Sequence, residues 1–390
     1  MTHTVIGGGL AGLTAALELA RSGAKVRLIE QHHELGGRAM TTVKDGFSLN
    51  LGPHALYLNG ATHRTLTEWG ILPSGTRPIL KAGSYMVTGG VKHPMVRDVA
   101  SLATCGFLSV LEKIEAGRML TKLTGGAVGI GAGLTIAQWL DREVSSVAVR
   151  RFAETLIRVS TYCDASEQSA EAALQQIHMA TGGVMYLDGG WQSMVRSLAD
   201  YARSLSVTIE TGTQAKAMEP NTILTGIPPE VEQLSGKKLP KLTPIRLAAL
   251  DLALDRLPED AAIFGLGLDE PLYYSLHSRW AKLGPDGGAV VHVGKYMGSR
   301  VSDAAAERAQ LEHFADLLMP GWRKHVHYAR FLPEMHVTHA VMGLDGRPDV
   351  DALGIPGVRI AGDWVGPEGM LADAAVASGR RAAQSIQREA

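Results

Sequence analysis

The sequence predicts an α/β protein with two lobes, one of which contains a parallel sheet assembled from both ends of the chain. Residues 4–6 and 25–29 are short β-rich runs, and apolar residues recur at helical spacing over residues 10–20, as in a β-α-β unit. A similar strand at 358–361, followed by a helix over 371–386, closes the sequence. Because a crossover helix makes its flanking strands parallel, we expect both ends to meet around one sheet.

The middle of the sequence predicts a second lobe, made of helices and of an antiparallel sheet with one covered face. The helices are expected at residues 107–120, 136–140, 147–159, 170–178, 191–205 and 304–319. The strands are expected at residues 207–209, 247–253, 272–276, 289–293 and 325–331. We therefore assign residues 1–75, 206–245 and 345–390 to the discontinuous lobe with the parallel sheet, and residues 76–205 and 246–344 to the second lobe.

Composition excludes several classes of protein. Among 390 residues, 38 Lys and Arg oppose 39 Asp and Glu, and the net charge of -1 argues against a nucleic-acid binder. Cys105 and Cys163 lie far apart and outside any C-x-x-C pair, so we expect neither a disulfide framework nor a metal site. No signal-peptide pattern opens the sequence, and no apolar run approaches ~18 residues, so a cytoplasmic protein without a membrane span is expected. Glycine, with 45 residues, is enriched over its usual ~7%.

The first glycine cluster follows the opening strand and fits the pattern G-x-G-x-x-G. Gly7 permits a tight turn, Gly9 lets the backbone approach a pyrophosphate, and Gly12 lets the helix pack closely on the strand. Glu30 ends the next strand, where its carboxylate can accept hydrogen bonds from a ribose. This context of strand, turn, helix and acid predicts a Rossmann-type dinucleotide site.

Two further bends would bring backbone close to the same ligand. Gly36 and Gly37 again allow close approach, and Arg38 can neutralise phosphate charge. Gly52 and Pro53 form a second tight bend.

The strand at 358–361 runs directly into Gly362 and Asp363. The carboxyl ends of strands are where open α/β sheets bind ligands, so Asp363 could hydrogen-bond a polyol chain there. The helix that follows would direct its N-terminus at an anionic part of the ligand.

Together these motifs resemble the FAD-binding signatures of the amine oxidase/phytoene desaturase superfamily of flavoproteins. The resemblance rests on residues 7–38, 52–53 and 362–379, and it is weaker at residues 186–191 and 268–273. It looks closest to the phytoene-desaturase-like and squalene-associated desaturase-like members. It runs along most of the chain, but the strong motifs cover only a minor part.

The resemblance implies a discontinuous Rossmann-type FAD-binding domain, a substrate domain of antiparallel sheet and helices, and FAD held without a covalent bond. Glu30 would bind the adenosine ribose, Asp363 the pyrophosphate–ribityl region, and a short strand near Ala215 the adenine. The N–H groups of Leu371 and Ala372 would face the flavin pyrimidine carbonyl, where negative charge builds up on reduction. The residues assigned to the cofactor are Gly7, Gly9, Leu10, Ala11, Gly12, Glu30, Gly36, Gly37, Arg38, Gly52, Pro53, Ala215, Gly362, Asp363, Leu371 and Ala372.

The sequence departs from the superfamily at one position that matters. Its amine oxidases usually carry a lysine at the start of a substrate-domain strand, whereas the corresponding strand here starts near residues 246–249 without one. Lys295 lies on a different strand. This departure argues against a standard amine oxidase.

The sequence assigns no catalytic side chain, but four residues are candidates for the substrate cavity. His54 follows the bend at residues 52–53 and could contact substrate or be a loop histidine bonded to backbone. Tyr274 and His277 lie in an alternating run and could line the cavity or fill the core. Lys295 could face the cavity or be a paired surface residue.

We therefore expect an FAD-dependent oxidoreductase that desaturates an apolar organic substrate by hydride transfer to the flavin. The alternatives are an amine or amino-acid oxidase using oxygen, a non-redox flavin isomerase, and a non-catalytic binding protein like the prenyl-protein chaperones of this fold. Oxygen, a quinone or another flavoprotein could accept the electrons, and the oligomeric state stays open. The amphipathic residues 107–120 resemble an entrance region that lies against a membrane in some desaturase-like relatives, so peripheral membrane contact also stays open.

Overall fold

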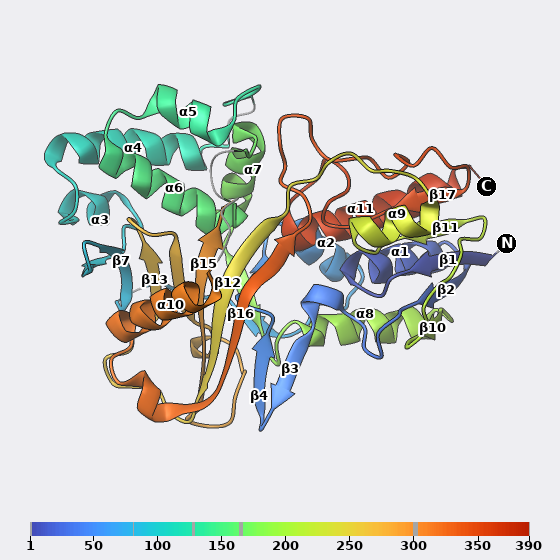
Figure 1. Cartoon of the computed structure of the whole chain (residues 1–390), viewed down its shortest axis with the longest axis horizontal. Helices are drawn as coiled ribbons and strands as arrows, with labels where there is room; N and C mark the ends of the chain where they lie inside the picture. Colours follow the sequence, from blue (N-terminus) through green and yellow to red (C-terminus); the bar gives the residue numbers. More distant parts are fainter. Residues whose placement is uncertain (1, 81, 127–128, 164–166, 299–302, 390) are drawn as a thin grey trace.

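The structure is a computed structural model that describes residues 2–80, 82–126, 129–163, 167–298 and 303–389. A lobe built on a parallel sheet lies beside a lobe built on a larger mixed sheet (Figure 1). This confirms the predicted α/β fold class. Within the described ranges, no helix is long and apolar enough to cross a membrane.

The parallel sheet draws strands from three distant parts of the chain, in the order β10-β2-β1-β11-β17. These strands are β1 (Thr2–Ile6), β2 (Lys25–Ile29), β10 (Thr208–Glu210), β11 (Thr222–Leu224) and β17 (Val358–Ile360). Helices α1 (Leu10–Arg21), α8 (Gln192–Ser204), α9 (Pro228–Ser235) and α11 (Leu371–Gln387) lie with them (Figure 1). The chain ends therefore meet in one sheet, as predicted.

Close packing of α1 against α11 explains why small residues recur in both helices. A Cβ at Gly379 would lie 2.5 Å from the Ala11 carbonyl oxygen, so only glycine allows this contact. Leu13 and Leu17 of α1 are fully buried in the core of this lobe, and each contributes roughly 1.5–3 kcal/mol.

Helix α8 packs on α1 and shares its core through Met194 and Leu198. The boundary drawn from the sequence at residue 205 separates α8 from that core. We propose that the division lies before α8.

The mixed sheet has the strand order β16-β12-β15-β14-β13-β7-β8. Its strands are β7 (Ser84–Thr88), β8 (Val91–Pro94), β12 (Ile245–Leu254), β13 (Phe264–Gly267), β14 (Leu272–Leu276), β15 (Ala289–Met297) and β16 (Val326–Thr338). All neighbours are antiparallel except β13 and β7, because β7 arrives from a distant part of the chain. The sheet is therefore mostly antiparallel, as predicted, with one parallel pair.

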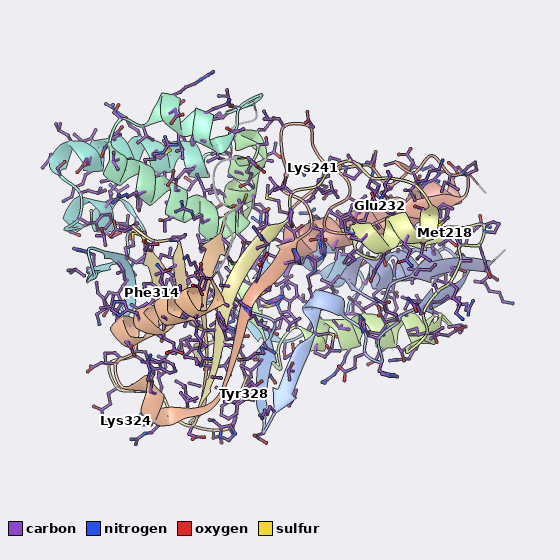
Figure 2. All side chains as sticks on the ribbon, in the orientation of Figure 1. Met218, Glu232, Lys241, Phe314, Lys324 and Tyr328 are labelled. Carbon is purple, nitrogen blue, oxygen red and sulfur yellow. The ribbon has the colours of Figure 1, made fainter. Side chains whose placement is uncertain are left out.

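Helices cover both faces of the mixed sheet, where the sequence predicted one covered face. Helix α10 (Ala304–Leu318) covers one face, and its Phe314 belongs to that layer (Figures 1 and 2). Phe152 packs with Tyr273 on the opposite face. The helices of that side are α3 (Val99–Thr104), α4 (Val110–Thr124), α5 (Ile136–Glu143), α6 (Val147–Thr161) and α7 (Ala170–Ala180).

The remaining elements are short. Helix α2 spans Ala61–Glu68, and single 3-10 turns form at η1 (Gly37–Ala39), η2 (His277–Arg279) and η3 (Trp322–His325). The short strands are β3 (Thr41–Lys44), β4 (Phe47–Asn50), β5 (Leu56–Tyr57), β6 (Gly75–Thr76) and β9 (Val184–Leu187). Tyr328 lies on β16, an edge strand of the mixed sheet (Figure 2). The ammonium nitrogen of Lys44 on β3 lies over its ring, 4.1 Å from the ring centre, in a cation–π contact.

Candidate functional site

The glycine loop after β1 leaves the first turn of α1 open to a cavity. Gly7 has a φ of 112°, and a Cβ at Gly12 would lie 1.8 Å from the Gly7 carbonyl oxygen, so both positions need glycine for backbone reasons. Gly9 caps α1 without a side-chain hydrogen bond, and the nearest atom to a Cβ there would be the Gly36 oxygen at 4.0 Å. The open helix N-terminus offers N–H groups that suit an anion.

Glu30 fixes this loop from the end of β2. Its carboxylate accepts hydrogen bonds from the N–H groups of Gly8 at 2.6 Å and His32 at 2.8 Å. The side chain is buried and lines the cavity. Each oxygen keeps a further lone pair that a ribose hydroxyl could use.

Arg38 and Asp363 form a two-bonded ion pair on the cavity wall, with N–O distances of 2.6 and 2.8 Å. Arg38 also donates to the Val337 carbonyl, and Asp363 accepts the His339 N–H. Burial alone would raise the pKa of Asp363, but the Arg38 guanidinium outweighs burial and lowers it. A fixed positive and negative group therefore stand side by side at the carboxyl edge of the parallel sheet.

Helix α11 begins at the cavity with an unusual residue. Leu371 has a φ of 57°, a left-handed conformation that costs energy for a non-glycine residue and is often found at functional sites. Leu371 and Ala372 line the cavity, and as the first residues of the helix their N–H groups have no intrahelical acceptor. The buried Asp373 accepts the Thr62 N–H at 2.8 Å, which joins this helix start to α2, and burial raises its pKa.

The bend at residues 52–54 brings a histidine to the cavity. Gly52 has a φ of 71°, and its carbonyl accepts a hydrogen bond from Nδ1 of His54 at 3.1 Å. The His54 ring meets Trp191 edge-on at 4.7 Å. Burial lowers the pKa of His54 to about 4, although the Gly52 carbonyl opposes that shift.

These features surround one cavity of about 740 Å³ that both lobes line. Its wall includes most of the residues that the sequence assigned to a cofactor, namely Gly7, Gly9, Leu10, Ala11, Glu30, Gly36, Gly37, Arg38, Pro53, Ala215, Gly362, Asp363, Leu371 and Ala372. Gly12 and Gly52 lie behind the wall and shape its backbone. Ala215 lies in a loop and not in the short strand expected there.

Of the four candidates for the substrate cavity, the structure places His54 alone on the cavity wall. Tyr274 is fully buried under α10, with its hydroxyl 3.5 Å from the Met319 sulfur. Lys295 pairs with Glu307 of α10 at 2.7 Å. His277 is buried behind the cavity and stacks on Tyr186.

Strand parity explains these corrections. Tyr274 and Lys295 occupy positions of β14 and β15 that face α10, whereas Tyr273 packs on the opposite face with Phe152. Alternation along a strand shows which residues share a face, but not which face borders a cavity. Of the alternatives that the sequence left open, the structure places Tyr274 and His277 in the core and pairs Lys295 with Glu307.

Sequence reasoning missed several residues of the site. The apolar part of the wall includes Tyr57, Tyr162, Leu247, Leu332 and Met335. Behind it lies a buried group of charged residues, Asp251, His292 and Arg330. A charged residue inside an otherwise apolar run, such as Asp251 in β12, was the available signal.

The residues present fit a dinucleotide. Gly9 and Gly37, which together we call the glycine cradle, leave space beside the backbone. The atom nearest to a Cβ built at Gly37 would be the Cα of Gly9, at 3.7 Å. Helices α1 and α11 direct their N-termini at one cavity that also holds the carboxylate of Glu30 and the guanidinium of Arg38. This donor and acceptor set suits phosphates and ribose hydroxyls. Among the described residues, no group of three His, Cys, Asp or Glu side chains could hold a metal.

Comparison with known proteins gives related sequences and folds. A family model described as an NAD(P)-binding Rossmann-like domain matches residues 5–68. The 4,4'-diaponeurosporene oxygenase of Staphylococcus aureus strain bovine RF122 / ET3-1 is 28% identical over 249 residues, which are 54% of this chain and 48% of that protein. The same protein from strain USA300 is 28% identical over 247 residues, 53% and 48% of the two chains. The chain thus spans about half the length of the curated relatives it matches.

Solved structures match the whole fold. An oxidoreductase from Methanosarcina mazei superposes with a TM-score of 0.79 at 17% identity, over 100% of both chains. A putative protoporphyrinogen oxidase from Exiguobacterium sp. 255-15 gives 0.71 at 18% identity, over 100% and 99% of the two chains. Putrescine oxidase bound to putrescine gives 0.72 at 16% identity, also over 100% and 99%. At these identities, the likeness establishes the fold.

Proposed function

The chain belongs to the amine oxidase/phytoene desaturase superfamily, and from that premise we propose that it is an FAD-dependent oxidoreductase that dehydrogenates an apolar organic substrate. The observation that carries the proposal is the shared cavity, whose wall changes from a glycine cradle and paired charges in one lobe to apolar side chains in the other. A dinucleotide cofactor and a second, apolar molecule would meet there.

The residues of the parallel-sheet lobe would hold FAD without a covalent bond. The open helix end at Gly9 and the Arg38 guanidinium supply positive charge for the pyrophosphate, and Glu30 supplies acceptors for the ribose. When bound, FAD would accept a hydride from the substrate. The N-terminus of α11 at Leu371 and Ala372 would stabilise the negative charge that this adds.

The other wall supports an apolar substrate. Leu247, Leu332 and Met335 line it beside Tyr57 and Tyr162, and buried apolar walls exclude water. The curated relatives are named as oxygenases of 4,4'-diaponeurosporene, which supports the desaturase-like side of the superfamily. Leu247 stands on the cavity wall near the start of β12, in the region where the amine oxidases of the superfamily carry a lysine.

Visible absorption of the purified protein tests the proposal directly. We expect a yellow protein that releases FAD on denaturation and that bleaches anaerobically with a member of a panel of apolar polyenes. A colourless protein that stays colourless after FAD is added would instead indicate a non-catalytic binding protein. Stoichiometric hydrogen peroxide on addition of an amine would favour an amine oxidase, and turnover without any electron acceptor would favour an isomerase.

We also propose that the protein acts in the cytoplasm and touches a lipid surface through an outer apolar patch, defined as Val99, Val110, Leu111 and Ile114. Val99 and Leu111 are 82% and 79% exposed on α3 and α4, at the end of the molecule far from the parallel sheet (Figure 1). The exposed Arg97 and Arg118 lie beside these residues in the sequence. Because the acids Asp98, Glu112 and Glu115 lie among the same residues, the exposed apolar side chains and not a net positive charge would carry this contact.

A further inference from the structure

A buried charged cluster lies on the cavity side of the mixed sheet. Asp251 of β12 accepts a hydrogen bond from Nδ1 of His292 on β15 at 2.6 Å and from the guanidinium of Arg330 on β16 at 2.6 Å. The side chains of Asp251 and His292 are 0% exposed. Because β15, β12 and β16 are neighbours in the sheet, the three residues meet on one face.

One nitrogen of this cluster has no partner. An ionised carboxylate accepts only, so Nδ1 of His292 donates its proton to Asp251, which also accepts from Arg330. Nε2 of His292 has no hydrogen-bond partner among the described residues. An unpartnered buried polar atom is costly and calls for an explanation.

One residue, Gly52, connects the cluster to the cavity through the two peptide groups that flank its Cα. The N–H of Gly52 points at Asp251, with 3.4 Å between nitrogen and Oδ2, and the carbonyl of the same residue accepts Nδ1–H of His54. Since Nδ1 of His54 is the donor, Nε2 of His54 bears the lone pair. The His54 ring is held by the edge contact with Trp191, and it lines the cavity.

We propose that His54, positioned by Gly52 and by the Asp251–His292 pair behind it, is the proton acceptor of this cavity. The proposal rests on the proposed dehydrogenase function. Dehydrogenation of two neighbouring carbons removes one hydrogen with its electron pair, as a hydride to the bound flavin. The other hydrogen leaves as a proton while its bonding pair becomes the new double bond, and Nε2 of His54 receives that proton.

The surroundings of His54 act on its pKa in both directions. In the cofactor-free protein burial lowers the pKa to about 4, and the nearby His292 acts in the same direction, so the imidazole is neutral at pH 7 and a weak base. The carbonyls of Gly52 and Arg38 and the carboxylate of Asp251 favour the charged form. His277, whose ring lies 4.5 Å from that of His292, also faces this cluster. Negative charge that arrives in the cavity on reduction would raise the pKa of His54 and make it a stronger base.

The test counts protons in the FAD-loaded protein without any substrate. The protein is photoreduced anaerobically by two electrons between pH 6 and 8 in weak buffer, and a pH-indicator dye reports the protons taken up. We expect the wild-type protein to take up more protons than His54→Gln, most clearly near pH 6, because a neighbouring negative charge raises a pKa by about 1–3 units and Gln cannot be protonated. His313→Gln, an exposed position on α10, should match the wild type.

The outcomes separate this proposal from the proposed function. Equal proton uptake in wild type and His54→Gln would overturn the role of His54 while the visible spectrum still shows bound FAD. A wild-type protein that binds no FAD would overturn the proposed function itself. Nitrogen-15 NMR of the imidazoles gives the same test without a variant: at pH 6 His54 should hold one proton in the oxidised protein and show a larger doubly protonated fraction in the reduced protein, and an unchanged state would overturn the proposal.

Discussion

Arg38 and Asp363 lie 325 positions apart in the sequence and form a two-bonded ion pair on the wall of the cavity. The Asp363 side chain is only 4% exposed, so this pair is shielded from water far more than the ion pairs of the outer surface. Through the Val337 carbonyl and the His339 N–H, the pair also ties the end of β16 to the loop after β17. Its removal should therefore affect both stability and cofactor binding.

Asp363→Asn should lower the free energy of unfolding by about 1–3 kcal/mol, because the buried Asp363 loses its charge-assisted hydrogen bonds while Arg38, 38% exposed, keeps part of its hydration. FAD affinity should fall at least ~10-fold, since the guanidinium is no longer held in place. Urea unfolding of the FAD-free protein and an FAD titration measure the two effects. The matched control is Asp349→Asn, whose partner Arg381 is half exposed, and which should cost under ~1 kcal/mol. Equal effects of the two variants would contradict the prediction.

Gly9→Ala and Gly12→Ala should separate folding from cofactor binding. At Gly12 the new Cβ would lie 1.8 Å from a backbone oxygen, so we expect a loss of roughly 3 kcal/mol or more, or no folded protein. At Gly9, with φ of -75°, alanine is allowed and meets no protein atom nearer than 4.0 Å, so the stability should change by less than ~1 kcal/mol. Gly9→Ala should still lose FAD, because its methyl group enters the cradle. Thermal unfolding and bound-flavin absorption give the comparison, and full FAD retention in Gly9→Ala would contradict it.

The stability of the FAD-free protein should depend on His54 in mild acid. The pKa of His54 is about 4 in the folded protein and about 6.5 in the unfolded chain, so the unfolded state binds the extra proton. This contribution is fully present above about pH 6.5 and is lost as pH falls towards 4, by on the order of 2–3 kcal/mol. His54→Gln should therefore show a flatter decline between pH 7 and 4 in urea unfolding. His313→Gln should follow the wild type, and parallel curves for all three proteins would exclude the effect.

The outer apolar patch should govern binding to lipid vesicles. Changing Val110 and Leu111 together to Ser should reduce flotation with phosphatidylcholine–phosphatidylserine vesicles several-fold, because two exposed apolar side chains no longer enter the interface. The melting temperature should hardly change, since both side chains point into solvent. Val43→Ser, an exposed valine on β3, is the control. Wild-type protein that does not float would remove the membrane proposal.

Local sequence patterns were enough to predict much of the fold. The opening β-α-β unit and the closing strand and helix appear as β1, α1, β2, β17 and α11, because periodicity and glycine spacing are local signals. The parallel neighbours β7 and β13 were out of reach, since they pair across 180 residues of sequence and their contact depends on tertiary packing. The short strands β5, β6 and β9 likewise show too few residues to reveal a pattern.

The two halves of the candidate site also differed in how far they could be predicted from the sequence. Backbone-built positions such as Gly9 and Asp363 could be located from motifs, because steric needs leave a mark in the sequence. The Asp251–His292 pair could not, because it depends on the register of β12 against β15 and on which face borders the cavity. His54 could be located from its bend, whereas for Tyr274 the sequence could not decide between cavity and core, because strand alternation does not show which face borders the cavity.

The position of β17 and α11 sets an order on how the protein forms during synthesis. All strands of the mixed sheet emerge by Thr338, before β17 begins at Val358. That lobe can therefore settle first, while β11 still presents an open edge and α1 lacks the helix that covers it. A chain stopped within β17 would have neither the Asp363 carboxylate nor the second helix end, so the FAD that we propose could load only once this lobe is complete.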